Sequence, residues 1–284
     1  MNRLVAVLVV CIVVLSAILG CLYWSPQPSY DTQKDSAINY LKGHFNESLG
    51  LLYESEDAGT RVVNGTAYRG NQTYFIYSDN LLAEWALKPY DPEMSDRINQ
   101  SIASYYQPSS KFFEVLFGSK IPINMSCAEQ PPIWQDSDSL VIAEIHDSTT
   151  PLAWQNYGDS LIYQSLNYYL AGDWPAANDT FFQAYHMWDD KGIRDASVEP
   201  NKPDAHYSNY KLALVLYASK VLNIPIKDYS EIEAKLWSMQ QQNGGVTSWA
   251  DLNGNQMGTA NTETTAIALL PYDNQLIVNM KSYH

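Results

Sequence analysis

Apolar residues recur at helical spacing through most of the chain after residue 30, and this pattern predicts a mainly α fold. In the first predicted helix, for example, Ile38, Leu41 and Phe45 share one face. Several starts are marked by Ser, Asp or Asn, or by a first-turn proline such as Pro92. The pattern predicts helices at about 31–45, 78–89, 92–106, 158–171, 173–188, 207–223, 228–241 and 260–270.

Two segments depart from the helical pattern. Residues 46–77 are polar and rich in Gly and Asn, and we interpret them as a long loop with room for a short hairpin. Within 107–156, the short apolar runs FFEVLF and LVIAEI are separated by loops that contain proline and glycine. We therefore expect a small β insert at about 107–156 that lies against the helical body.

Taken in chain order, the predicted helices form successive hairpins in which each second helix opens with polar residues. Degenerate helical hairpins bury their apolar faces only by stacking on their neighbours. If the hairpins curl into a ring, the second helices line its inside and their N-termini open on one rim. The polar openings are Ser78-Asp79-Asn80, Gly158-Asp159-Ser160, Ser208-Asn209 and Thr262-Glu263.

Residues 228–270 carry a more specific pattern. Lys235-x-Trp237-x-x-Gln240 is followed by Gly244-Gly245 and Trp249, and then by Asn261-Thr262-Glu263-Thr264-Thr265-Ala266. This arrangement resembles the repeat of the α/α toroids of terpenoid cyclases and protein prenyltransferases. The resemblance implies helical hairpins in a complete or incomplete α/α toroid.

The chemistry of those families is not matched. Squalene-type cyclases protonate with Asp-x-Asp-Asp, whereas this chain has Trp188-Asp189-Asp190. Asp195 follows at the wrong spacing for an Asp-rich magnesium motif, and no Asp/Cys/His zinc set accompanies the segment. The resemblance therefore implies the fold but neither the reaction nor a metal site.

The N-terminal run from Leu4 to Trp24 is apolar and long enough to span a bilayer. Arg3 precedes it and the next basic residue is Lys34, which places the N-terminus inside and the remainder outside. Ile18-Leu19-Gly20-Cys21 resembles a lipobox, in which Cys21 would be lipidated after cleavage. We expect an uncleaved helix or a lipid anchor at 1–24, with a signal peptide as the alternative. A tether at 25–30 and an extracytoplasmic domain at 31–284 follow.

Composition and glycosylation motifs agree with an exterior location. The chain has six Asn-x-Ser/Thr sequons, at Asn46, Asn64, Asn71, Asn99, Asn124 and Asn178. It carries a net charge of −14, which argues against nucleic acid as a partner. Its 46% hydrophobic content is enough for a real core and excludes general disorder.

The predicted rim supplies the candidate site. Paired carboxylates are what glycoside cleavage requires, and the candidates are Asp79, Asp159 and Glu263. Aromatic faces can stack on sugar rings, and helix N-termini favour polyhydroxyl or anionic ligands. The ligand-binding candidates are Tyr77, Asn80, Tyr207, Asn209, Trp249 and Asp251. The structural alternative is that these residues are helix caps and core aromatics.

Two further motifs leave alternatives open. Cys127-Ala128-Glu129-Gln130 is similar to the Cys-Gly-Glu-Gln thioester of α-macroglobulin and complement proteins, although alanine replaces the glycine and Pro131-Pro132 follow. The alternative is a buried free thiol. Asp251-x-Asn253-x-Asn255 resembles the start of a calcium loop, but Gly254 falls early and Glu263 one place late, so a polar turn is the simpler interpretation.

Together these patterns favour a membrane-anchored surface protein that binds or cleaves a glycan or another surface polymer. The alternative is a non-enzymatic scaffold or partner-binding module, in which the rim carboxylates serve as caps. A thioester trap that joins Cys127 to Gln130 is a more distant alternative.

Overall fold

The structure, a computed structural model, describes residues 29–56, 61–63, 66–68, 73–106, 112–121, 125–136, 138–151, 153–198, 202 and 205–283. The chain divides into a unit of Met1–Asp31 and a unit of Thr32–His284. The predicted anchor and Cys21 lie outside the described residues. Among the residues that are described, no helix is long and apolar enough to cross a membrane.

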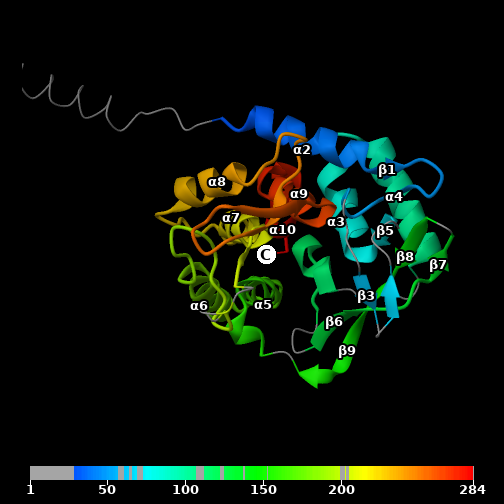
Figure 1. Cartoon of the computed structure of the whole chain (residues 1–284). Coiled ribbons are helices and arrows are strands. Elements are labelled where there is room, and N and C mark those ends of the chain that lie inside the picture. The colour runs from blue at the N-terminus through cyan, green and yellow to red at the C-terminus, as the bar shows by residue number, and fades with distance from the viewer. Residues whose placement is uncertain are drawn as a thin grey trace, which may run out of the picture. The chain divides into compact units, whose positions relative to one another are not determined.

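The second unit is mainly α, as predicted (Figure 1). Its helices are α2 (Asp31–Gly43), α3 (Tyr77–Leu87), α4 (Pro92–Tyr105), α5 (Gly158–Leu170), α6 (Trp174–Tyr185), α7 (Tyr210–Leu222), α8 (Tyr229–Ser238), α9 (Thr262–Leu269) and α10 (Asn274–Lys281). Local capping sets several of these starts: Asp91, Asp173 and Asn261 each accept a hydrogen bond from the backbone N–H three residues ahead. α10 was not predicted, although it buries Leu276, Ile277 and Met280.

The helices pack in pairs, but most pairs differ from the predicted hairpins because each begins one helix later in the chain. α3 packs on α4, α5 on α6, and α7 on α8, so of the four predicted pairs only α6 with α7 is in extensive contact within the described chain. α9 packs on both α3 and α7, and α7 also packs on α5 and α10. In Figure 1, α6, α7 and α8 lie on one side of the unit and β5, β7 and β8 on the other.

The run FFEVLF, predicted to be β-like, instead forms the 3-10 helix η1 (Phe112–Phe117). A short apolar run has no periodicity that distinguishes strand from helix. Here Val115 and Leu116 are fully buried, η1 contacts both α3 and α5, and the Tyr217 hydroxyl donates to the Leu116 carbonyl. The turn ends at Gly118, whose φ of 97° suits glycine.

Short strands occupy the connections between the helices. They form a hairpin of β3 (Arg61–Val63) and β4 (Thr66–Tyr68), and pairs of β1 (Phe45–Asn46) with β2 (Leu51–Leu52) and of β6 (Met125–Glu129) with β9 (Glu144–Pro151). β5 (Thr73–Ile76) lies parallel to β8 (Ser139–Ile142), which also pairs with β7 (Trp134–Gln135). LVIAEI therefore contributes β8 and the start of β9, and β8 pairs with β5, which directly precedes α3.

Another small sheet, not predicted from the sequence, is built mainly from the segment between α8 and α9. β11 (Thr247–Ala250) and β12 (Gln256–Ala260) form an antiparallel hairpin, and β10 (Tyr207–Ser208) adds a strand just before α7. Because β10 precedes α7 and β12 precedes α9, this sheet holds the N-termini of two helices next to each other. It forms one wall of the candidate site.

Candidate functional site

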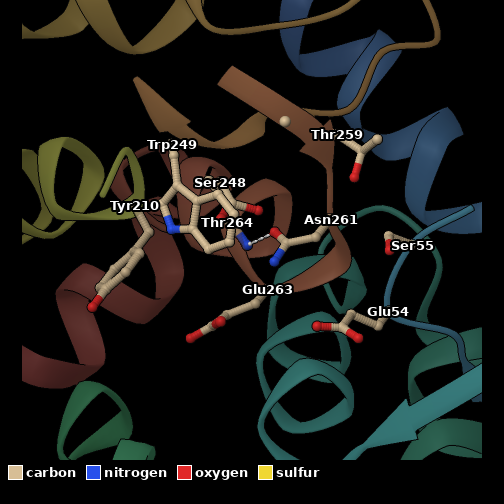
Figure 2. Close-up of a pocket in the computed structure, with 10 residues that line it drawn as sticks. Glu54, Ser55, Tyr210, Ser248, Trp249, Thr259, Asn261, Glu263 and Thr264 are labelled. Atoms are coloured by element: carbon tan, nitrogen blue, oxygen red, sulfur yellow. Dashed lines mark hydrogen bonds between the residues drawn. The ribbon is translucent and has the colours of Figure 1, made fainter. Parts of the chain in front are cut away.

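A hollow of about 460 Å³ lies at the N-termini of α7 and α9. Three segments surround it: the chain that follows β2, the β11–β12 hairpin and the first turns of the two helices. Its lining residues are Glu54, Ser55, Tyr210, Ser248, Trp249, Gly258, Thr259, Asn261, Glu263 and Thr264. Figure 2 shows the Glu54 and Glu263 carboxylates and the Trp249 indole projecting into the space between these segments.

The hairpin that carries Trp249 is fastened to α7 by buried hydrogen bonds. The Asn209 side-chain amide donates to the carbonyl and hydroxyl oxygens of Thr247 at 2.8 and 3.0 Å, and the Asn209 N–H donates to the Ser248 carbonyl at 2.9 Å. Trp249 itself stays 46% exposed, which is unusual for so large an aromatic side chain. Its ring centroid lies 5.1 Å from that of His206.

The opposite wall is tied to the start of α9. The Thr262 N–H donates to the Glu54 carbonyl at 2.8 Å, and the Thr262 hydroxyl donates to the Tyr53 carbonyl at 2.6 Å. Asn261 caps α9 by accepting from the Thr264 N–H at 2.8 Å. Because these bonds fix the backbone on both sides, Glu54 and Glu263 occupy one rigid frame although they are far apart in sequence.

A buried charge network supports Tyr210 beneath the hollow. Its hydroxyl donates to Asp159 Oδ2 at 2.5 Å, and Lys211 Nζ lies 3.5 Å from Asp159 Oδ1 and 2.5 Å from Asp195 Oδ2. Burial, followed by the nearby charge of Asp159, raises the pKa of Tyr210 well above its ordinary value. The hydroxyl therefore stays protonated and keeps its hydrogen bond over the physiological pH range.

Of the three predicted catalytic carboxylates, the structure places only Glu263 in this hollow. Asp159 lies behind Tyr210 and accepts its hydrogen bond. Asp79 is 2% exposed in the first turn of α3. Burial is the main reason that the pKa values of Tyr40 and Tyr106 are raised, and the charge of Asp79 adds to it. The three residues therefore do not line one cavity.

The predicted ligand-binding residues also separate into groups, and among them Trp249 lines the hollow. Tyr77, Asn80, Tyr207 and Asn209 are all at most 4% exposed. The Asn80 side chain accepts from the Leu52 N–H and donates to the carbonyls of Leu52 and Ile76. The Tyr207 hydroxyl donates to Asp189.

Asp251 belongs to a polar turn rather than to the hollow. It accepts from the N–H groups of Asn253 and Asn255 and from the Asn255 side chain. The hydrogen bond from the Asn255 side chain is the main reason that the pKa of Asp251 lies below its usual value. In the described part of the chain, no group of three or more His, Cys, Asp or Glu residues is placed to hold a metal ion.

The helix N-termini are less open than the predicted rim implied. The Ser78 N–H of α3 donates to Glu144 Oε2 at 2.7 Å, and the Gly158 N–H of α5 donates to Asp195 Oδ1 at 2.8 Å. Carboxylates of the chain itself thus occupy two of the sites expected to attract a ligand. Of the four predicted helix starts, those of α7 and α9 contribute residues to the hollow.

Several lining residues were missed by sequence reasoning. Glu54 and Ser55 fall in a segment interpreted as a loop, and Ser248 and Thr259 belong to the unpredicted hairpin. Glu263 could be predicted because it lies at a capped helix start that follows a Gly-Gly turn in the sequence. Nothing local in the sequence indicates that Glu54 and Glu263 line the same hollow.

The sequons differ in their surroundings. Asn99 is exposed on α4, and Asn178 is part-buried on α6. The side-chain oxygen of Asn46 accepts from Ser48 and Leu49 in the turn after β1. Asn64, Asn71 and Asn124 lie outside the described residues.

Comparison of the chain with protein-family models, curated proteins and solved structures gave no match.

Proposed function

We propose that this chain is a membrane-anchored, N-glycosylated surface protein whose hollow at α7 and α9 binds carbohydrate. The anchor would be the apolar run from Leu4 to Trp24, as an uncleaved helix or, after cleavage, a lipid on Cys21. The proposed architecture is a small α/α toroid. Its support is a circuit of packed elements in which α9 contacts α3 and α7, α7 contacts α5, and η1 contacts both α5 and α3.

The observation that carries the carbohydrate proposal is the half-exposed Trp249 beside two carboxylates. An aromatic ring offers an apolar face to the C–H groups of a sugar, while carboxylates and hydroxyls accept and donate the hydrogen bonds of its hydroxyl groups. The hollow supplies both kinds of group, through Trp249 and through Glu54, Glu263, Ser55 and Thr259. Its volume of about 460 Å³ is within the usual range for small-ligand sites.

If the site acts as an enzyme, its two glutamates, Glu54 and Glu263, are the residues suited to catalyse glycoside cleavage. Glycoside cleavage needs two carboxyl groups on opposite sides of the scissile bond. Glu54 and Glu263 come from different walls of the hollow, so this pair replaces the earlier set of Asp79, Asp159 and Glu263 as the catalytic candidates. Binding is the primary proposal, and hydrolysis is its enzymatic form.

The alternatives from the sequence have less support. A scaffold would fill this region, whereas the hollow is open and its tryptophan is exposed. For a thioester trap, Cys127 must reach Gln130. β6 runs to Glu129 and Gln130 continues the ladder by donating to the Ala143 carbonyl, so the two Cα atoms are separated by about 10 Å of extended chain. That backbone does not favour the cross-link.

Binding to a glycan array by the full chain tests the proposal, with Trp249→Ala and Glu263→Gln as variants. We expect wild-type binding to fall at least about tenfold in each, because each change removes a group that faces the ligand. Met257→Ala is the matched control, since Met257 lies opposite Trp249 in the hairpin and is 38% exposed but does not line the hollow. Absence of glycan binding by the stable wild type, or equal binding by all variants, would contradict the proposal.

A further inference from the structure

A second hollow, of about 240 Å³, lies next to the Trp249–His206 pair. His206 lines this hollow together with Asp195, Ser197 and Ser208, among other residues. Trp249 lines the first hollow, and its ring centroid is 5.1 Å from that of His206. One aromatic pair therefore borders both hollows.

The two hollows are also linked by a chain of buried polar contacts. Asp195 lines the second hollow and binds Lys211 Nζ at 2.5 Å, and Lys211 lies 3.5 Å from Asp159, which accepts from the Tyr210 hydroxyl of the first hollow. Lys211 is only 4% exposed, so this connection is a buried floor rather than a surface contact. Removing one member of such a network leaves an uncompensated buried charge, so the network favours the arrangement that keeps its members together.

We infer that the two hollows are adjacent subsites for one linear oligosaccharide, which crosses the Trp249–His206 pair. This inference rests on the proposed function and specifies its ligand as a chain of sugars rather than a single sugar. The second hollow is below the volume usual for a drug-sized ligand and suits one additional ring. Its lining combines the apolar side chains of Val198 and Ala205 with the hydroxyls of Ser197 and Ser208, which match the C–H and hydroxyl groups of a sugar.

The inference predicts how affinity depends on ligand length. A ligand that occupies both subsites gains the second contact without a second loss of translational freedom, so binding strengthens when the chain is long enough to reach it. A monosaccharide occupies the first hollow alone. Changes in the second hollow should therefore weaken long ligands and spare short ones.

The test is calorimetric titration of the full chain with glucose and N-acetylglucosamine and with their β-1,4-linked dimers and tetramers. In the wild type we expect affinity to rise at least about tenfold from monomer to tetramer in the series that binds. Ser197→Trp fills the second hollow from an exposed position and should abolish that rise while monomer binding is unchanged. Thr259→Trp, an exposed residue of the first hollow, is the matched variant and should abolish binding of every length.

His206→Ala is a second variant that adds no bulk, and it should reduce the length dependence in the same direction. Thermal unfolding of each variant within a few degrees of the wild type shows that the fold is retained. Equal affinity at all lengths, or an unchanged rise in both Ser197→Trp and His206→Ala, overturns the extended site but leaves the first hollow as a binding site. Failure of both sugar series to bind overturns the proposed function, and this inference with it.

Discussion

His44 lies buried between the rings of Tyr40 and Tyr53, with both ring-centroid distances at 4.0 Å. Its Nδ1 donates to the Tyr53 carbonyl at 3.1 Å, which makes Nε2 the unprotonated nitrogen of the neutral ring. Nε2 has no hydrogen-bond partner among the described residues. A proton on Nε2 would therefore be a buried, unpaired charge, and burial lowers the pKa of His44 to about 4.

This depressed pKa predicts acid destabilisation. The unfolded chain takes up the His44 proton below about pH 6.5, whereas the folded chain resists it down to about pH 4, so stability is lost as pH falls through this window. Between pH 7 and pH 5 we expect a loss of about 2 kcal/mol in the free energy of unfolding from His44 alone.

Urea unfolding of the wild type and of His44→Gln at the two pH values measures this loss. Glutamine does not titrate, and the difference between the two proteins cancels the contributions of carboxylates they share. Parallel pH profiles for the two proteins would show that His44 does not carry the effect.

Single residues also show why site prediction was incomplete. Asn80 and Asn209 stand at helix starts, where an amide can cap the helix, bind a ligand or fasten another segment. In the structure both side chains hold another segment in place: Asn80 forms hydrogen bonds with the backbone of Leu52, and Asn209 donates to the Thr247 carbonyl. Those partners come from distant parts of the chain, so the local sequence of either asparagine cannot distinguish the roles.

At the scale of elements, the Gly244-Gly245 turn is where α2 meets the segment before β11. Gly244 has a φ of 93°, and a Cβ atom there would lie 2.3 Å from the Ser36 carbonyl oxygen of α2. A Cβ atom on Gly245 would lie 2.5 Å from the Tyr40 ring, and the Gln240 side chain donates to the Gln33 carbonyl. The glycines thus allow α2 to pack directly against the turn.

Gly244→Ala should destabilise the protein by roughly 2–4 kcal/mol, since it adds a backbone clash to the strain of positive φ. Gly172→Ala is the matched control: its φ is 79°, and a Cβ atom there meets nothing within 4 Å in the described structure, so it should cost only about 1 kcal/mol. Urea unfolding of both variants gives the comparison. Equal costs would mean that α2 yields to the added methyl group and is not firmly packed.

The secondary-structure prediction was right where apolar residues recur at helical spacing over a long segment. It was wrong where contacts with distant segments determine the local structure. The predicted helix at about 31–45 matches α2, and the one at 92–106 matches α4. FFEVLF was misassigned because six residues carry no period, and the β11–β12 hairpin was missed because its strands are short and half polar. The local sequence does not determine the conformation of either segment. Hydrogen bonds from distant residues stabilise them, from Tyr217 to η1 and from Asn209 to β11.

At the scale of the whole molecule, the sequence indicated stacked helical hairpins but not their partners. Amphipathic periodicity shows that a helix has an apolar face, and it does not say which neighbour covers that face. Two long-range contacts illustrate this: α9 packs on α3, and the Tyr40 hydroxyl donates to the carbonyl of Ala260, 220 residues away. The candidate hollow depends on this long-range packing, since Glu54 precedes α3 and Glu263 lies in the first turn of α9.

The net charge of −14 also acts on the molecule as a whole. Salt weakens exposed ion pairs such as Arg97–Glu47, but each such pair contributes about 1 kcal/mol or less. Repulsion among the excess carboxylates opposes the compact state and is screened by the same salt. Because the excess charge is large, we expect screening of the repulsion to prevail and the protein to gain stability with salt.

Raising sodium chloride from about 20 mM to about 300 mM should increase the unfolding temperature by roughly 2–4 °C, which corresponds to about 1 kcal/mol. Two exposed substitutions change the net charge by two units in opposite directions: Asp179→Lys should flatten this response, and Lys227→Glu should steepen it. Differential scanning calorimetry of the three proteins at both salt concentrations measures the effect. The same response in all three would assign the salt effect to something other than net charge, and a falling unfolding temperature would mean that the ion pairs outweigh the repulsion.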